Sequence, residues 1–367
     1  MKCKSERVIG RYRLRDNIKN VNWYQYQECE LLKSRGQPLG VYAALRHIKA
    51  MNNSEAGLLN AAEPNLLVRL HGAIPPSPAW FQALDCSPEA QFVTVDGARI
   101  EFFTWGEPGT PGLLLVHGNR AHARWWGPVA PLLAQAGFRV ASMSLSGHGG
   151  SSWRDAYHVD QLAAEMFAVA AAAGLKDNST GYFIAAHSFG GGPTILATEV
   201  AEPALSGIVV LDAGLMANEG KMPVDYSRKL RSYGSLTEGL ARFRLSPPEP
   251  CENLYLLDFV GRNALMEENG TWRWCFDPYF LDRLGRRDSW AALAAPKRRM
   301  AIMYGELSTI VAGQRLEGVR LQAPPGTPFI SIPQAGHHVM LDQPLALTSA
   351  INAVLACWLS EPAPASE

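Results

Sequence analysis

The chain has 367 residues, of which 47% are hydrophobic, so it is long enough for one large enzyme domain with additional segments. Lys and Arg together equal Asp and Glu, at 34 each, and this balance does not indicate a nucleic acid or an anionic membrane as partner. Its six cysteines are scattered, at positions 3, 29, 86, 251, 275 and 357, and none forms a Cys-x-x-Cys pair. This spacing argues against a structural zinc site and against a disulfide scaffold.

The N-terminal region differs in composition from the rest of the chain. Residues 1–50 hold eleven Lys or Arg against four Asp or Glu, and their helical periodicity is weak. We interpret residues 1–63 as a basic, poorly ordered extension, with binding to an anionic surface as the alternative. No apolar segment typical of a signal peptide follows Met1, and the apolar stretch 166–175 is too short to span a membrane. These features predict a cytoplasmic protein without a membrane span.

A regular alternation of strands and helices is predicted after the extension. Phe92–Val95 and Arg99–Phe103 are joined by Asp96-Gly97, which is a strong signal for a β-hairpin. Apolar runs then alternate with helical patterns, which predicts a mainly parallel sheet that is covered on both faces. Further strands are expected near 112–117, 138–145, 181–187, 207–212, 299–304 and 327–332.

The segment Ala186-His187-Ser188-Phe189-Gly190-Gly191 carries the most information about function. It stands between an apolar strand and the start of a helix, and a serine between small residues at such a junction is typical of a nucleophile elbow. The turn there is so tight that larger neighbouring side chains would clash with the strand and the helix. An ordinary phosphate-binding loop is the alternative interpretation.

Three other motifs accompany the elbow at the ends of predicted strands. They are His117-Gly118-Asn119, Ser146-Gly147-His148-Gly149-Gly150-Ser151 and Gln334-Ala335-Gly336-His337-His338. In order and spacing the four motifs resemble those of the α/β-hydrolase family, and the resemblance runs from about residue 88 to 359. It implies a mainly parallel eight-stranded sheet, with a core formed by 64–214 and 297–367. It also implies a helical cap, 215–296, inserted after the sixth strand.

A catalytic triad is expected from the same resemblance. Ser188 needs a base to attack a substrate near neutral pH, and His337, which follows a glycine after the last predicted strand, is the expected base. Many members place the acid at Gly-x-x-Asp after the seventh strand, but this chain has Gly305-Glu306-Leu307-Ser308. Asp212, at the end of the sixth strand, is the preferred acid. Glu306 is the alternative, because it would face the same side if its strand continued.

The oxyanion hole is expected from the backbone N–H groups of Phe189 and Asn119. Trp125 and Trp126 are expected to border the pocket or to contact the cap. No metal-binding or dinucleotide-binding motif is present, so the expected chemistry needs no metal and no cofactor.

The identity of the nucleophile limits the reaction. Dehalogenases and epoxide hydrolases of the family need an aspartate there, because an alkylated serine would be a dead-end ether. Ser188 therefore favours a serine esterase or lactonase. Hydrolysis of a carbon–carbon bond in a diketone-like substrate, and a non-enzymatic ligand-binding protein, are the alternatives.

The predicted cap indicates the kind of substrate. Its many aromatic residues favour a small apolar or aromatic ester. Its arginines are candidates to pair with a substrate carboxylate, although solvation at the surface is the favoured interpretation for them: Arg228, Arg231, Arg242, Arg273, Arg286 and Arg287.

Overall fold

The computed structural model describes residues 66–84, 88–215, 231–285 and 287–361. The extension predicted for residues 1–63 lies outside the described residues, as do Arg228 and Arg286 of the predicted cap.

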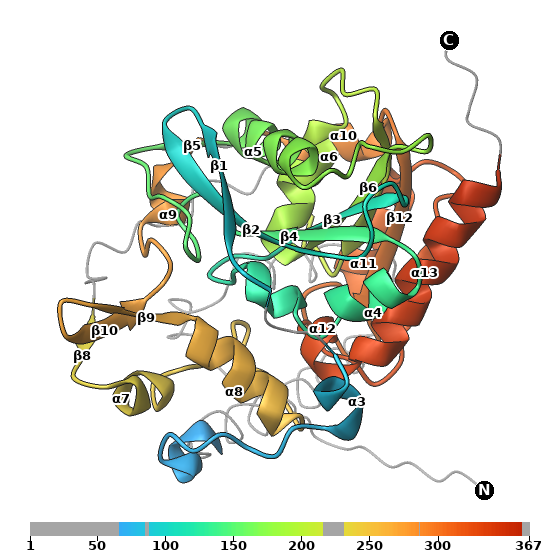
Figure 1. The fold of residues 1–367 in the computed structure, drawn as a ribbon. Coiled ribbons are helices and arrows are strands. Elements are labelled where there is room, and N and C mark those ends of the chain that lie inside the picture. The colour runs from blue at the N-terminus through green and yellow to red at the C-terminus, as the bar shows by residue number, and fades with distance from the viewer. Residues whose placement is uncertain (1–65, 85–87, 216–230, 286, 362–367) are drawn as a thin grey trace, which may run out of the picture. The chain divides into compact units, whose positions relative to one another are not determined.

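An eight-stranded, mainly parallel sheet forms the centre of the fold, as predicted (Figure 1). Its strands, in the order β1-β2-β4-β3-β6-β7-β12-β13, are β1 (Gln91–Val95), β2 (Ala98–Trp105), β4 (Arg139–Met143), β3 (Gly112–Val116), β6 (Tyr182–His187), β7 (Leu205–Leu211), β12 (Arg299–Gly305) and β13 (Phe329–Ile332). Strands β1 and β2 form the expected hairpin, with Asp96 and Gly97 both at positive φ. Strand β2 also runs antiparallel to β4, and the remaining strand pairs are parallel.

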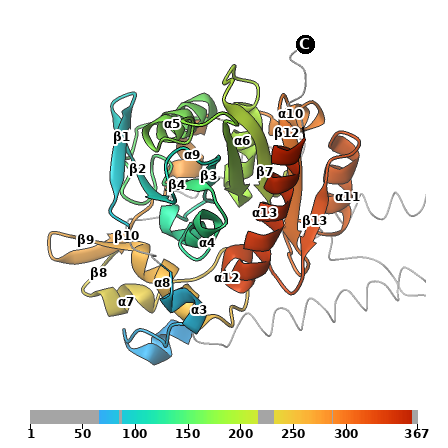
Figure 2. The ribbon, with the colours of Figure 1, turned by 45° about the vertical axis from the view of Figure 1, so that its right-hand side comes forward.

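Helices cover both faces of this sheet (Figure 2). One face packs against α4 (Ala130–Gln135) and α13 (Pro344–Ser360), and the other against α5 (Val159–Ala172), α6 (Gly191–Ala197), α10 (Ser289–Ala294) and α11 (Gly313–Gln322). The side chains of β3 alternate between the two cores, which explains why this central strand is apolar at every position. None of the described helices is long and apolar enough to cross a membrane.

The segment between β7 and β12 is not purely helical. Its described part, residues 231–285, is called the insertion below. It contains α7 (Leu236–Leu240), α8 (Leu254–Asn263), α9 (Phe280–Arg283), β11 (Leu284–Gly285) and a three-stranded antiparallel sheet of β8 (Ser232–Tyr233), β10 (Thr271–Trp274) and β9 (Leu265–Glu268). Strands β9 and β10 are joined by Asn269-Gly270, with both residues at positive φ. This dipeptide is a strong hairpin signal that the expectation of a helical cap did not take into account.

A lead-in segment packs against the insertion. It contains a 3₁₀ turn, η1 (Leu66–Leu70), and a short helix, α3 (Ala79–Gln82). Phe81 of α3 packs edge-on against Tyr255 and Phe259 of α8, with ring centroids 5.1 and 5.6 Å apart. Contacts of this kind add to the apolar burial of the rings, so the lead-in segment helps to hold α8 in place.

Candidate active site

Ser188 lies on a strained turn between β6 and α6. Its φ of 52° is in the left-handed region, which residues other than glycine rarely adopt. A Cβ added at Gly190 would come within 2.6 Å of the carbonyl oxygen of His117, and one added at Gly191 within 2.7 Å of the Ala213 Cβ. Glycine is therefore required at both positions, for the steric reason that the sequence indicates, and the turn has the geometry of a nucleophile elbow.

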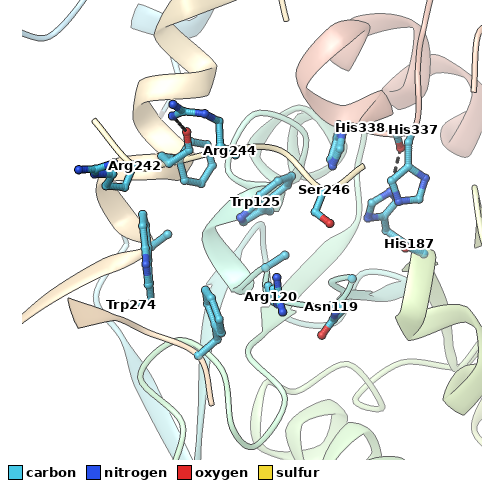
Figure 3. Close-up of a pocket in the computed structure, with 16 residues that line it drawn as sticks. Asn119, Arg120, Trp125, His187, Arg242, Arg244, Ser246, Trp274, His337 and His338 are labelled. Atoms are coloured by element: carbon cyan, nitrogen blue, oxygen red, sulfur yellow. Dashed lines mark hydrogen bonds between the residues drawn. The ribbon is translucent and has the colours of Figure 1, made fainter. Parts of the chain in front are cut away.

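Ser188 opens into a cavity of about 230 Å³ (Figure 3). One side of the cavity is formed by loops that follow β3, β6 and β13, and the other by the insertion. The lining includes Ser188, His337, His338, Asn119, Arg120 and Trp125 from the core, and Arg242, Phe243, Arg244, Trp274 and Phe276 from the insertion. In the part of the chain that the structure describes, no group of three or more His, Cys, Asp or Glu is placed to hold a metal ion.

His337 and Asp212 are brought together from loops after β13 and β7. His337 Nδ1 lies 2.7 Å from Asp212 Oδ1, and both side chains are buried. A carboxylate oxygen accepts, so Nδ1 carries the proton and Nε2 is left with its lone pair. Among the hydrogen bonds of the described residues there is none between Ser188 and His337, although both line the cavity. Such bonds are often long before substrate binds.

Asp212 is held by three donors. Its Oδ2 accepts from the Gly305 amide at 2.7 Å, and its Oδ1 accepts from the Ser308 hydroxyl at 2.7 Å as well as from His337. Its own backbone is at a φ of 45°. Ser308 occupies the position where many similar hydrolases have the acid, so this chain uses that position to donate a hydrogen bond to the carboxylate of Asp212.

Glu306 does not join this group. It is exposed, and its Oε2 accepts from the backbone amide of Gln334 at 3.0 Å. Strand β12 ends at Gly305, and the Leu307 amide bonds to the carbonyl of Ala335. The alternation of a strand therefore does not extend to Glu306, which contacts neither Ser188 nor His337 among the described hydrogen bonds.

The loop after β3 is pressed against Ser188. A Cβ at Gly118 would lie 2.9 Å from the Ser188 Cβ. His117 Nε2 accepts from the Leu145 amide at 3.0 Å, so its Nδ1 carries the proton and donates to the Gly118 carbonyl at 2.6 Å. This neutral histidine fixes the loop that carries Asn119 to the cavity wall.

The remaining predicted residues lie in different places. Trp125 is buried and lines the cavity, as expected. Trp126 does not line the cavity but lies fully buried in the core, where its bulk fills space under the loop. The Phe189 ring packs against Phe280, with centroids 5.3 Å apart, while its backbone directly follows Ser188.

Sequence reasoning missed Glu249, which approaches the His337 loop from the insertion. Its Oε2 accepts from the His337 amide at 2.8 Å and from His338 Nδ1 at 3.1 Å. Burial alone would raise the pKa of this carboxyl, but the hydrogen bond and charge of His338 and the His337 amide together lower it. No motif surrounds Glu249, so only the folded arrangement reveals it.

Four buried histidines at and behind the cavity make stability depend on pH. Burial lowers the pKa of His117 and His122 to about 3 and that of His148 to about 4, and it lowers the pKa of His187 well below its usual value. As the pH falls below about 6.5, the unfolded chain takes up protons that the folded chain does not. We expect this part of the stability to be complete above pH 6.5. It should be lost toward about pH 4, on the order of 1 kcal/mol per histidine for each pH unit.

Urea unfolding between pH 7 and pH 5 measures this loss. His148→Gln should reduce the dependence of the free energy of unfolding on pH, because one of the four groups is gone. The exposed His158 provides the matched control, and His158→Gln should keep the wild-type slope. Equal slopes for His148→Gln and wild type would contradict the prediction.

The chain is similar to known proteins both in sequence and in fold. The sequence model described as Alpha/beta hydrolase family matches residues 113–350. Esterase Rv0045c of Mycobacterium tuberculosis is 25% identical over 283 residues, which cover 73% of this chain and 90% of the esterase. Two solved structures share the fold, each with a TM-score of 0.60. The thioesterase domain from the curacin biosynthetic pathway is 20% identical over 72% of this chain and 99% of its own. E-2-(acetamidomethylene)succinate hydrolase is 16% identical over 73% and 99%.

Proposed function

The chain belongs to the alpha/beta hydrolase family, and from this premise we propose that it is a serine hydrolase that cleaves a carboxylic ester or lactone through an acyl-enzyme. The observation that carries the proposal is the hydrogen bond of 2.7 Å between His337 Nδ1 and Asp212 Oδ1, because His337 lines the same cavity as Ser188, whose φ is 52°. The similarity to an esterase that covers most of both chains supports the same class of reaction.

In the proposed mechanism, His337 Nε2 takes the proton of Ser188 Oγ as this oxygen attacks the substrate carbonyl. Asp212 keeps His337 in the productive tautomer and stabilises the imidazolium. The backbone N–H groups of Phe189 and Asn119 bind the negative charge that develops on the carbonyl oxygen.

Collapse of the tetrahedral intermediate completes the first half of the reaction. The bond to the leaving oxygen breaks, and that oxygen takes the proton from His337, which leaves an acyl group on Ser188. Water then attacks the acyl group while His337 accepts its proton, and the carboxylic acid is released as Ser188 regains its hydrogen. Each step conserves protons, which pass between Ser188, His337, the leaving oxygen and water.

A fluorophosphonate probe tests whether Ser188 is activated. We expect one adduct by intact mass on the wild-type chain, and turnover of simple aryl esters or lactones by the same preparation. A folded chain with neither the adduct nor turnover would contradict the proposal and would favour a binding protein on the hydrolase fold.

We further propose that Glu249 is a positioning residue for His337. Its carboxylate binds the His337 amide and is negatively charged near the imidazole, where it stabilises the imidazolium that forms in the proposed mechanism. Glu249→Gln removes this charge and weakens the hold on the His337 amide. We expect kcat to fall about tenfold or more because the base is less well placed, while KM for a small ester changes little.

Glu252 offers a matched control for this variant. It lies on the same loop, is exposed, and neither lines the cavity nor binds the His337 loop. Glu252→Gln should keep the wild-type kcat and KM. A Glu249→Gln variant whose KM rises while its kcat stays at the wild-type value would argue against the positioning role.

A further inference from the structure

The charged side chains that line the cavity are cationic. Arg120 reaches it from the loop after β3, and Arg242 and Arg244 reach it from the insertion. Figure 3 shows Arg120 close to Asn119 and below Trp125. Arg242 and Arg244 lie toward the upper left of the same view. Among the described lining residues there is no Asp or Glu.

The two nearest carboxylates of the site are already engaged. Asp212 is bound by His337, Ser308 and the Gly305 amide. Glu249 binds the backbone of His337 and the ring of His338. Neither carboxylate lines the cavity, so neither faces Arg242 or Arg244 across it.

The arginines that the sequence offered as partners of a substrate carboxylate differ in their contacts. Arg273 pairs with Glu268, and Arg287, just beyond the insertion, pairs with Asp160 and Glu199; both are away from the cavity. The two at the cavity are exposed at its mouth and have no ion pair with a described residue. Arg244 donates to the carbonyls of Ala241 and Phe243, at 3.1 and 2.7 Å, which leaves its charge uncompensated.

Arg120 has a left-handed backbone conformation, which is unusual for a residue other than glycine. Its φ is 59°, and its guanidinium lies 5.6 Å from the centroid of the Phe276 ring on the insertion. Non-glycine residues at positive φ are costly and concentrate at functional sites, where the surrounding structure holds them. The strained backbone here places a cation beside Asn119.

We propose that the cavity recognises an ester that carries a carboxylate, with Arg120 and Arg242 as the groups that bind it. This inference rests on the proposed function, because it takes the Ser188 cavity as the substrate site. A guanidinium binds a carboxylate through two parallel hydrogen bonds, and aromatic walls such as Trp125 and Trp274 suit the apolar part of the same molecule. The uncharged part of a small ester and its one anionic group thus have separate partners.

Binding and turnover are both needed to test this inference. Phenylacetate and its neutral amide are titrated by calorimetry into the Ser188→Ala protein, where no chemistry interferes. We expect the carboxylate to bind about tenfold more tightly than the amide. Wild-type kcat/KM is then measured for p-nitrophenyl hydrogen glutarate and for its neutral methyl ester at low and high salt. The anionic ester should be preferred, and salt should reduce that preference.

Charge variants show which residue is responsible. Arg242→Gln should lower the ratio of kcat/KM between the anionic and the neutral ester about tenfold. Arg231→Gln, an exposed change of the same charge in the same insertion but outside the cavity lining, should leave that ratio unchanged.

The outcomes separate this inference from the proposed function. Equal binding of phenylacetate and the amide would overturn the carboxylate preference, whatever the enzyme hydrolyses. An equal loss in Arg231→Gln and Arg242→Gln would also overturn it, because only general charge would then matter. Carboxylate preference in binding without hydrolysis of any ester would support this inference and refute the hydrolase.

Discussion

Replacing Ser188 by alanine is expected to lower kcat for ester hydrolysis by about 10⁴-fold or more. The attacking oxygen is lost, and neither Asp212 nor His337 can replace it, because both act on the proton of that oxygen. Removal of any one member of such a group costs nearly as much as removal of all, so the effect should be close to the full catalytic contribution of the triad. Steady-state kinetics with an aryl ester measure the fall in kcat, and intact-mass analysis after fluorophosphonate treatment measures the loss of labelling.

Ser188→Gly supplies the control for folding. Glycine adopts a φ of 52° without steric cost, so this variant should be as stable as the wild type or slightly more stable. It should still be inactive and unlabelled. Loss of activity in the alanine variant alone, with an active glycine variant, would mean that misfolding and not a missing nucleophile explains the result. Residual turnover above a hundredth of wild type in both would contradict the role of Ser188.

Local signals explain why so much of the fold was predictable. Each central strand is a short apolar run bounded by turn residues. A run of this kind is typical of a strand that is buried on both faces of a parallel sheet. The elbow was predictable for a similar reason, since the steric demand for glycine at 190 and 191 acts between neighbours in the chain. His337 was found because its motif follows the last strand directly.

Which carboxylate lies beside His337 was ambiguous from the sequence, because long-range geometry decides it. Asp212 and Glu306 both follow apolar strands, and the sequence does not show where β12 ends. In the structure it ends at Gly305, which turns Glu306 toward Gln334 and places Ser308 against Asp212. The sequence did not indicate a role for Glu249 for the same reason, since its partners His337 and His338 lie 88 and 89 residues away in the chain.

Backbone strain is concentrated around the candidate active site. Of the seven non-glycine residues at positive φ among the described residues, three are Arg120, Ser188 and Asp212. Each follows or belongs to a loop at the carboxyl end of a sheet strand, where ligands of open α/β sheets bind. The closely packed core beneath them offsets the cost of these conformations. They bring Ser188 and Arg120 to the cavity and place Asp212 behind it, against His337.

Asp212→Asn is expected to lower kcat by about 10³- to 10⁴-fold, whereas Glu306→Gln should retain nearly wild-type kcat. An asparagine keeps the size of the side chain but presents an amide, so it no longer stabilises the imidazolium of His337 or fixes its tautomer. Glu306 is exposed and bound to Gln334, so its change affects a surface contact alone. Circular dichroism and urea unfolding check that Asp212→Asn folds, because Asp212 also holds Gly305. Equal, mild effects of the two variants would contradict the assignment.

A second change decides whether the lost group is the charge itself. Ser308 Oγ lies 2.7 Å from the Asp212 oxygen that binds His337, so an aspartate at 308 reaches the same ring nitrogen. Asp212→Asn combined with Ser308→Asp should recover about tenfold or more of the kcat that Asp212→Asn loses. Ser308→Ala combined with Asp212→Asn should recover nothing, because it supplies no carboxylate. Recovery by the aspartate alone would show that His337 needs a carboxylate at this point in space and that either strand end can provide it.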